Sequence, residues 1–437
     1  MSAHPTRARR TAAAVGALGT ALALTSCAGG SSAPAGEPET PDQPVELRMT
    51  VWTADEAQLG LFQDIADAYV AENPELVSGV SFETIPFEDY TTALTTQLAG
   101  GNAPDLAWVF ESNAPEFVAS GALVDLRPVL EGTDGYAADD LVPSALSLWE
   151  DGDGLYAYPF STSPFAVFVN TDQISAAGQP DPADLVADGE WTFDAARDIA
   201  AATAEDSGKQ GLVVRDFDYQ SWENLATVWS GWQAQPWSAD GTECTFTDPA
   251  MVDALTWFHD AVFTDGALPG PGTTADFFAG DAAMTITQIS RASSLDDSFA
   301  WDVVPLPAGP AGQQDVVGQA GIGVFAAGDH PDVAADFLAY FTDPENAAQL
   351  AAYFPPPRAS LLNGEDLAAA NPRLSAEQLE SVVVDAVEDA VTKPAHASFA
   401  KLSETVRAEL DALWVEDADV EAVLADTCAA ITPLLED

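Results

Sequence analysis

Three strand patterns alternate with three helix patterns over residues 45–119, and this order restricts the fold more than any other feature of the sequence. The segments are, in turn, Val45 to Trp52, Asp55 to Ala71, Val77 to Phe87, Tyr90 to Leu98, Asp105 to Phe110 and Pro115 to Ala119. The third strand is very apolar, as strands buried in parallel sheets are. The repeat predicts an α/β fold with a doubly wound parallel sheet. Such sheets bind ligands at the carboxyl ends of their strands, where Trp52 and residues 110–113 lie.

The length and the charge of the chain limit its architecture and its partners. At 437 residues the chain exceeds one ordinary hydrophobic core, so two lobes are expected. It has 14 Lys and Arg residues against 70 Asp and Glu residues, a net charge of −56 at pH 7. Such a surface repels nucleic acid, gives no basic patch for anionic lipid and disfavours anionic ligands. Neutral or cationic small molecules are the expected partners, although such a charge also serves solubility alone.

Residues 1–26 have the features of an export signal. Three arginines form a basic start, and the small apolar segment that follows is too short to span a membrane. The signal runs into Leu-Thr-Ser-Cys, which resembles a bacterial lipobox with Cys27 as the lipidated residue. Acyl chains on Cys27 would hold the protein at the outer face of the cell membrane. Export could follow either the Sec or the twin-arginine pathway, and the sequence leaves both open. Residues 27–44 have the composition of a flexible tether.

Two further cysteines, Cys244 and Cys428, form an even pair in an exported chain. An oxidising compartment permits a disulfide between them, which would tie the end of the chain to its middle. Two buried thiols are the alternative, because free cysteine packs as a small apolar residue. The sequence leaves both possibilities open.

Four of the eleven tryptophans gather between Tyr219 and Trp237. Trp222, Trp229 and Trp232 share one face if the segment is a helix. One interpretation is a core face, because aromatic side chains bury large areas wherever they pack. The other is an aromatic wall for a sugar ring, whose polar neighbours would be Gln220, Glu223 and Gln233.

Several short motifs then follow in a fixed order along the chain. They are Ala103-Pro104-Asp105-Leu106, Gly121 to Leu126, Tyr158-Pro159 with Val169-Asn170, Trp191-Thr192-Phe193, Gly280 to Met284, Pro305-Leu306-Pro307 and Asp343-Pro344-Glu345. Because these motifs occur in this order, and because a lipobox precedes them, the chain resembles the family 1 extracellular solute-binding proteins of ABC importers, the group that includes maltose-binding protein. The resemblance runs from Val45 to the C-terminus.

This resemblance implies a two-lobed, type II periplasmic-binding-protein-like α/β fold, in which each lobe is a doubly wound sheet with flanking helices. The lobes would be discontinuous and joined by a hinge. The N-terminal lobe would take residues 45–166 plus 317–352, and the C-terminal lobe residues 168–316 plus 353–437. A monomer would close over ligand in the cleft between them and present a surface to the permease subunits of an ABC importer.

The resemblance also places the ligand contacts, residue by residue. The positions are Trp52, Asp55, Phe110, Glu111, Asn113, Phe160, Ser161, Trp222, Thr287, Gln288, Gln319 and Arg358. Some family members have tryptophan near Gln288 or near Gln319, where this chain has none, so stacking is expected from Trp52 and Trp222. For Arg358 the alternative is a surface ion pair, and Trp108 is expected in the core.

The main functional hypothesis is therefore a lipid-anchored receptor for a neutral mono- or oligosaccharide. The alternative is a receptor for a quaternary ammonium or polyamine, held by tryptophans near Glu111 or Glu223. An enzyme is not expected, because the chain lacks Gly-x-Ser-x-Gly, His-x-x-x-His and phosphate-loop motifs, and its four histidines do not cluster. No cofactor and no metal are expected.

Overall fold

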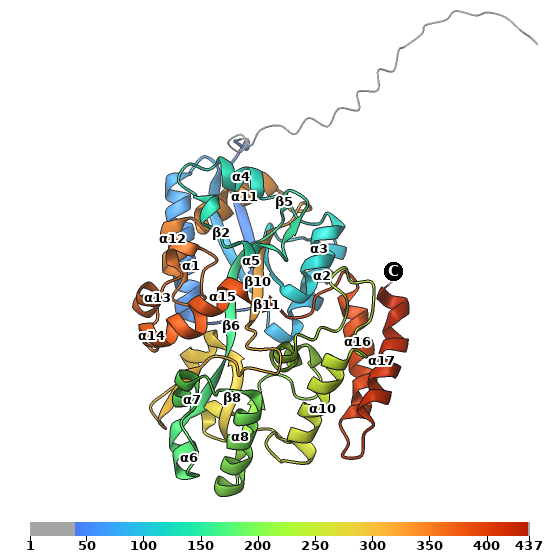
Figure 1. Cartoon of the computed structure of the whole chain (residues 1–437). Helices are drawn as coiled ribbons and strands as arrows, with labels where there is room; N and C mark the ends of the chain where they lie inside the picture. The colour runs from blue at the N-terminus through green and yellow to red at the C-terminus, as the bar shows by residue number, and fades with distance from the viewer. Residues whose placement is uncertain (1–39, 436–437) are drawn as a thin grey trace, which may run out of the picture. The chain divides into compact units, whose positions relative to one another are not determined.

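The computed structural model describes residues 40–435, apart from the side chains of Glu88, Glu388 and Asp389. The expected export signal, Cys27 and residues 28–39 of the expected tether lie outside this range. The described part is a mixed α/β structure (Figure 1). Within residues 40–435, no helix combines the length and the apolar character that a membrane crossing requires.

Eleven strands and seventeen α-helices make up the described part. The strands are β1 (Val45–Val51), β2 (Val77–Thr84), β3 (Leu106–Phe110), β4 (Glu150–Asp151), β5 (Gly154–Leu155), β6 (Tyr158–Asn170), β7 (Gln210–Val214), β8 (Ala282–Gln288), β9 (Trp301–Val304), β10 (Val316–Val324) and β11 (Val391–Thr392). The helices are α1 (Glu56–Glu72), α2 (Tyr90–Ala99), α3 (Ala114–Ser120), α4 (Arg127–Gly132), α5 (Pro143–Leu146), α6 (Thr171–Ala176), α7 (Pro182–Asp188), α8 (Phe193–Ser207), α9 (Ala226–Trp229), α10 (Pro249–Phe263), α11 (Pro331–Phe341), α12 (Pro344–Leu350), α13 (Gly364–Ala370), α14 (Ala376–Leu379), α15 (Asp385–Asp389), α16 (Phe399–Leu410) and α17 (Val420–Leu435).

The first lobe, as we call the part built on β1, β2 and β3, has the strand–helix order that the sequence predicts. Its three strands are parallel in the order β2-β1-β3, and α1 and α2 connect them. Helix α1 begins where it does because the carboxylate of Asp55 accepts a hydrogen bond from the N–H of Gln58, at 2.8 Å. The carboxyl ends of β1 and β3 therefore lie on the same edge of the sheet.

Two long buried strands join the first lobe to the second. Strand β6 pairs with β10 at Tyr158 to Pro164, and with β8 and β9 from Phe165 onward. Strand β10 pairs in turn with β3, so one continuous strand order runs β2-β1-β3-β10-β6-β8-β7. Both β6 and β10 run antiparallel to their neighbours in this order. Each lobe therefore has a mixed sheet, in which β6 and β10 are antiparallel to their neighbours in this order and its remaining strands pair in parallel.

The second lobe, built on β7, β8 and β9, has a core on each face of its sheet. Strand β6 shows this directly: Phe165, Val167 and Val169 belong to one core, and Ala166 and Phe168 to the other. Successive side chains of a strand point to opposite faces, so β6 contributes to both cores.

The last third of the chain divides between the lobes. Residues 320–341 pack in the core of the first lobe, whereas helices α16 and α17 pack in one core of the second lobe. Residues 367–387 contribute to the other core of the second lobe. The chain therefore returns to the first lobe before it ends in the second, while the lobe boundaries given above remain a prediction.

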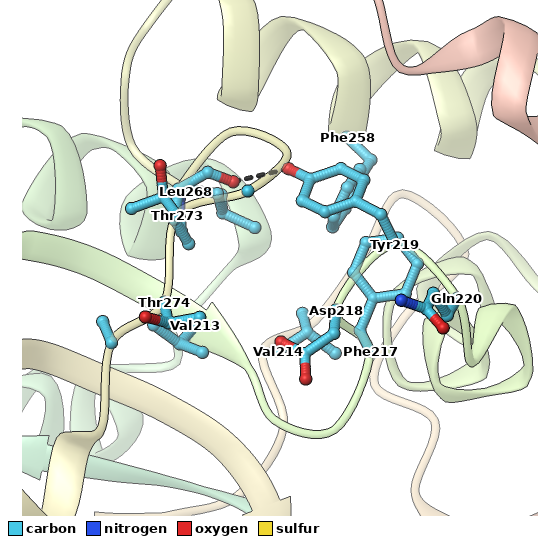
Figure 2. A pocket seen from close by; sticks show the side chains of 13 residues that line it. Val213, Val214, Phe217, Asp218, Tyr219, Gln220, Phe258, Leu268, Thr273 and Thr274 are labelled. Atoms are coloured by element: carbon cyan, nitrogen blue, oxygen red, sulfur yellow. Dashed lines mark hydrogen bonds between the residues drawn. The ribbon is translucent and has the colours of Figure 1, made fainter.

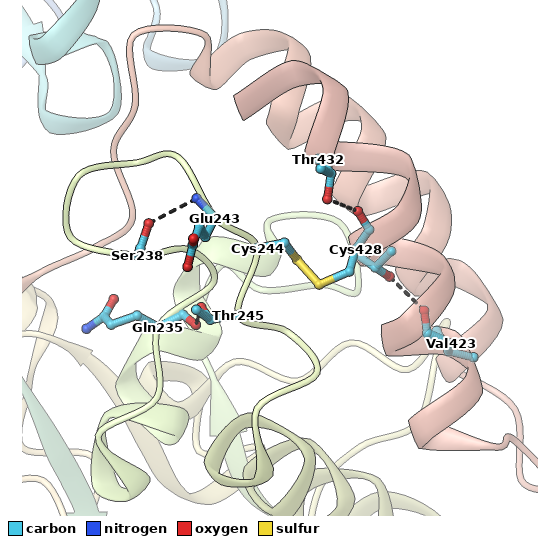
Figure 3. The surroundings of a disulfide bond; sticks show 9 residues. Gln235, Ser238, Glu243, Cys244, Thr245, Val423, Cys428 and Thr432 are labelled. Carbon is cyan, nitrogen blue, oxygen red and sulfur yellow. Dashed lines mark hydrogen bonds between the residues drawn. A yellow bond between two sulfur atoms is a disulfide. The ribbon is translucent and has the colours of Figure 1, made fainter. Parts of the chain in front are cut away.

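A disulfide links Cys244 to Cys428 (Figure 3). Cys244 lies in the loop before α10, and Cys428 lies on α17, with 5.5 Å between their Cα atoms. The bond joins positions 184 residues apart in the sequence. It attaches the terminal helix to the middle of the second lobe.

Candidate functional site

An aromatic corner, formed by Trp52, Phe87, Tyr90 and Phe110, lies at the carboxyl ends of β1, β2 and β3. The rings of Trp52 and Phe110 are stacked, with 4.3 Å between centroids and 13° between planes. Tyr90 meets Trp52 edge-on at 5.1 Å, and Phe87 meets Phe110 edge-on at 4.9 Å. Phe87 is 62% exposed, so the corner presents open aromatic surface. Phe87 and Tyr90 were not predicted as site residues from the sequence, although the second strand was expected to end at Phe87; the structure ends β2 at Thr84.

The interior side of this corner is packed against the core of the first lobe. Trp108 stacks on Phe160 with 4.5 Å between ring centroids and meets Trp52 at 4.6 Å. Trp108 is buried, as the sequence predicts, and Phe160 is nearly so. This packing fixes the orientation of Trp52, because its ring is held on more than one side.

Asp55 and Asn113 lie near the same strand ends but already have local hydrogen bonds. The carboxylate of Asp55 caps α1, as described above, and the Asp55 side chain is exposed. The amide oxygen of Asn113 accepts a hydrogen bond from the hydroxyl of Thr91 at 3.3 Å. Both residues therefore stabilise the edge of the sheet, whatever else they contact.

Four further predicted residues lie on or beside the strands that join the lobes, Ser161 on β6, Gln319 on β10, and Thr287 and Gln288 on β8. Gln319 is buried on β10, and its amide oxygen accepts a hydrogen bond from the indole N–H of Trp149 at 3.2 Å. Ser161 pairs with Ala320 beside it, and Thr287 pairs with Ala166 on the second-lobe half of β6. The amide of Gln288 lies so close to Gly318 that a Cβ there would overlap it. Gly318 in β10 thus marks a close approach of the two strands.

Trp222 is a core residue, so its expected place in a ligand wall is not supported. It is 1% exposed, and its indole N–H donates to the hydroxyl of Ser403 on α16 at 3.1 Å. Its neighbours include Trp229 and Phe399, with ring centroids at 6.0 and 6.3 Å. The segment is also no single helix, because short 3-10 turns at residues 222–225 and 230–232 flank α9. Of the two interpretations of the tryptophan-rich segment, the structure favours the core.

Arg358 is a buried structural residue, which corrects both expectations for it. Its side chain has 0% exposed surface, and its guanidinium donates to the backbone carbonyls of Tyr136, Ala137 and Thr342. It also lies 4.6 Å from the centre of the Tyr136 ring and 3.6 Å from the carboxylate of Asp140. Neither a surface ion pair nor a ligand contact fits a cation so completely enclosed.

An interlobe ion pair, formed by Glu111 and Lys393, lies next to the aromatic corner. Glu111 follows Phe110 directly and is 6% exposed, and its carboxylate is 2.9 Å from the Lys393 ammonium. Lys393 follows β11 and also lies 3.5 Å from the amide oxygen of Asn224 in the second lobe. Helix α16 packs against the short turn of residues 111–113 at the same place. Lys393 was not predicted, because its sequence neighbours give no sign of Glu111.

Burial and charge set the protonation of this cluster. Burial raises the pKa of Glu223, and the nearby Lys393 ammonium lowers it only in part. Burial lowers the pKa of Lys393, but the carboxylates of Glu111 and Glu223 outweigh burial, so the net shift is upward. Lys393 is therefore a charged ammonium at neutral pH, with carboxylates of both lobes around it.

A surface hollow of about 320 Å³ lies in the second lobe (Figure 2). Phe217, Tyr219 and Phe258 line it together with Thr273 and Thr274. The hydroxyl of Tyr219 donates to the backbone carbonyl of Pro269 across its rim. The residues that line the hollow all belong to the second lobe, so it is separate from the aromatic corner. No group of three or more potential metal-ligating side chains is found in the described part of the chain.

The two lobes, joined by β6 and β10, have the fold of two-lobed solute-binding proteins. The chain belongs to the family of bacterial extracellular solute-binding proteins, whose family model matches residues 64–376.

Three known proteins illustrate this relationship. A putative binding protein of Brucella abortus (strain 2308) is 27% identical over 296 residues, which are 62% of this chain and 66% of the relative. An uncharacterized lipoprotein of Streptomyces antibioticus is 24% identical over 348 residues, 76% of this chain and 72% of that protein. An ABC substrate-binding protein of Listeria monocytogenes in complex with cycloalternan has a TM-score of 0.77 and 24% identity, covering 90% of this chain and 99% of that chain. This chain thus spans just under two thirds of the Brucella relative.

Proposed function

We propose that the protein is a receptor for a neutral mono- or oligosaccharide, which it binds between its lobes for an ABC import system. The observation that carries the proposal is the aromatic corner with the interlobe ion pair directly beside it. The Listeria protein of the same fold, in complex with cycloalternan, supports a cyclic oligosaccharide or a similar sugar as the ligand class.

The chemistry of the site fits a sugar. A pyranose has apolar C–H faces that pack on aromatic rings, and hydroxyl groups around its edge that both donate and accept hydrogen bonds. Trp52, Phe87 and Phe110 supply the aromatic surface, while Glu111 supplies an acceptor and Lys393 a donor. These hydrogen bonds gain strength as closure of the lobes removes water.

A cationic ligand, the alternative considered above, is not favoured by the same cluster. The Lys393 ammonium already lies between Glu111 and the Asn224 amide, where a ligand cation would have to compete with it. Trp222, one of the expected cage residues, is in the core. We therefore keep the neutral sugar as the proposed ligand.

The rest of the proposal concerns location and transport. Lipidation at Cys27 after removal of residues 1–26 would anchor a monomer at the outer face of the cell membrane, and a relative is named as a lipoprotein. The lobes, with the boundaries predicted above, would close over the sugar and deliver it to membrane permease subunits. No catalytic step is part of this role, so a bound oligosaccharide should be recovered uncleaved.

Tryptophan fluorescence tests the ligand class. We expect neutral sugars from a broad panel, cycloalternan included, to shift the emission, because Trp52 changes its surroundings on binding. Trp52→Ala should weaken binding at least about tenfold, which is about 1.4 kcal/mol. Trp301→Ala, in β9 of the second lobe, is the matched control and should bind as the wild type does.

Salt separates the two ligand classes. The affinity for a neutral sugar should change little between low and high ionic strength, whereas a cation would bind much more weakly at high salt. A folded protein that responds to no sugar in the panel, by fluorescence or calorimetry, contradicts the proposed function.

A further inference from the structure

The interlobe ion pair connects two parts of the molecule that otherwise have separate cores. Glu111 begins the turn after β3 and belongs to the first lobe. Lys393 follows β11, whose residue Val391 packs against a core of the second lobe. The distance of 2.9 Å between the ammonium and the carboxylate is that of a charge-assisted hydrogen bond. The ion pair, together with the packing of α16 against residues 111–113, thus links the lobes outside the strands that join them.

The ammonium is held from the second lobe as well. Asn224 lies 3.5 Å from it, and the negative charges of Glu223 and Asp216 favour its charged form. The side chains of Lys393 and Glu111 are only 17% and 8% exposed. An ion pair this protected from water is screened less by salt than a surface pair.

The local backbone of the second lobe is strained at this place. The loop after β7 contains Asp216, Asp218 and Tyr219 with positive φ angles of 59°, 42° and 58°. The carbonyl of Asp216 accepts a hydrogen bond from the side chain of Asn224 at 3.1 Å. Non-glycine residues occupy the left-handed region only where surrounding structure enforces it, and they gather at functional sites. The loop thus holds Asn224 where it meets Lys393.

We propose that the Glu111–Lys393 ion pair is a latch that keeps the lobes closed without ligand, and that a hydroxyl-bearing ligand takes its place. One ligand hydroxyl would donate to Glu111 and another would accept from Lys393, so both charges stay hydrogen-bonded. An anionic ligand meets repulsion from Glu111 and a cationic one from Lys393, so the latch selects for neutral, hydroxylated molecules. The ligand half of this inference rests on the proposed function, whereas the latch itself does not.

The latch predicts a measurable equilibrium. Without ligand, the closed state should dominate in the wild type, and loss of the ion pair should release the open state. An ion pair that contributes about 1 kcal/mol shifts such an equilibrium about fivefold. Because the open state admits the ligand, a shift toward it raises the apparent rate of association.

Single-molecule energy transfer in the absence of any sugar tests the latch. The full chain carries Cys27→Ser to remove the unpaired thiol, and dyes are attached at Ala68→Cys on α1 and Glu205→Cys on α8, which are exposed positions on different lobes. We expect one dominant distance in the wild type. Lys393→Gln and Glu111→Gln should each move the population about fivefold or more toward a second distance. Lys393→Arg, which retains the ion pair, should restore the first distance.

The control breaks an ion pair within one lobe. Arg127→Gln removes the contact of Arg127 with Glu150 in the first lobe and should leave the distances unchanged. High salt should shift the wild type toward the second distance much less than Lys393→Gln does, because the enclosed pair is little screened. The latch proposal is wrong if Lys393→Gln and Glu111→Gln both show the same dye distances as the wild type while their circular dichroism is unchanged. Since no sugar is added, this result is independent of whether the proposed function holds.

Discussion

At the scale of single residues, burial decides whether a charged side chain can bind a ligand or has a structural role. Arg358 looks like a ligand-binding cation in the sequence, yet it joins three backbone carbonyls inside the first lobe. A guanidinium has five N–H donors in a planar fork, which suits several carbonyls at once. Arg358 therefore connects the residues around Tyr136 to the end of α11, and its role is structural.

Arg358→Met should destabilise the protein by about 3–5 kcal/mol, because it leaves the carbonyls of Tyr136, Ala137 and Thr342 buried without a donor. Urea denaturation measures the change. Arg373→Met, at an exposed position, is the control and should stay within about 0.5 kcal/mol of the wild type. Equal denaturation midpoints for both variants contradict this role.

The raised pKa of Glu223 predicts how the stability of the fold depends on pH. Burial raises its pKa in the folded state above the ordinary value, so the folded protein binds more protons than the unfolded chain between the two values. The carboxyl of Glu223 therefore costs stability once pH rises above its ordinary pKa, and the cost is complete above its raised pKa. Glu223→Gln should raise the melting temperature at about pH 8 more than at about pH 4. The exposed control Glu205→Gln should show no such trend, and an equal gain at both pH values argues against the shift.

At the scale of elements, the terminal helix α17 depends on distant parts of the chain. Its residues Leu424 and Ile431 are buried in a core of the second lobe, and Cys428 links it to the loop before α10. A crosslink between positions 184 residues apart removes much conformational freedom from the unfolded chain. The helix is thus held by packing and by a covalent bond.

The double variant Cys244→Ala, Cys428→Ala should lose about 2–5 kcal/mol of stability. Chemical denaturation is the measurement, and a reducing agent should destabilise the wild type without further effect on the double variant. Cys27→Ala serves as the control because Cys27 is outside this disulfide. The prediction is refuted if the wild type and the double variant unfold at the same denaturant concentration.

At the scale of the whole molecule, the net charge of −56 acts on every part of the fold. Like charges repel one another across a compact protein, and the repulsion is relieved when the chain expands. Salt screens this repulsion over about 10 Å at 0.1 M ionic strength. Two of the few cations, Arg358 and Lys393, lie at enclosed positions with side-chain exposures of 0% and 17%, so they do little to balance the acidic surface.

Stability should therefore increase with ionic strength. We expect the melting temperature to rise by several degrees between about 0.02 M and about 0.5 M NaCl, as the acidic surface is screened. A neutral osmolyte at the same osmolality controls for effects other than screening. A melting temperature that falls with NaCl would show that attractive surface ion pairs dominate.

Local patterns in the sequence determined the first lobe and part of the site. The periods of strands and helices over residues 45–119 predicted its parallel order, because those periods are local properties of the chain. The carboxyl ends of β1 and β3 follow from that order, and with them the positions of Trp52, Phe110 and Glu111. Family resemblance extended the same reasoning to the two-lobed fold.

Only the tertiary structure decided the other half of the site. Trp222 lies in the core because Ser403 and Phe399 arrive from α16, and Lys393 meets Glu111 because β11 pairs with the start of β10. No local sequence pattern predicts these long-range contacts, because burial depends on which distant segment packs over a residue. The sequence by itself thus determined which side chains stand at the strand ends, and the long-range packing decided which of them are exposed, buried or paired.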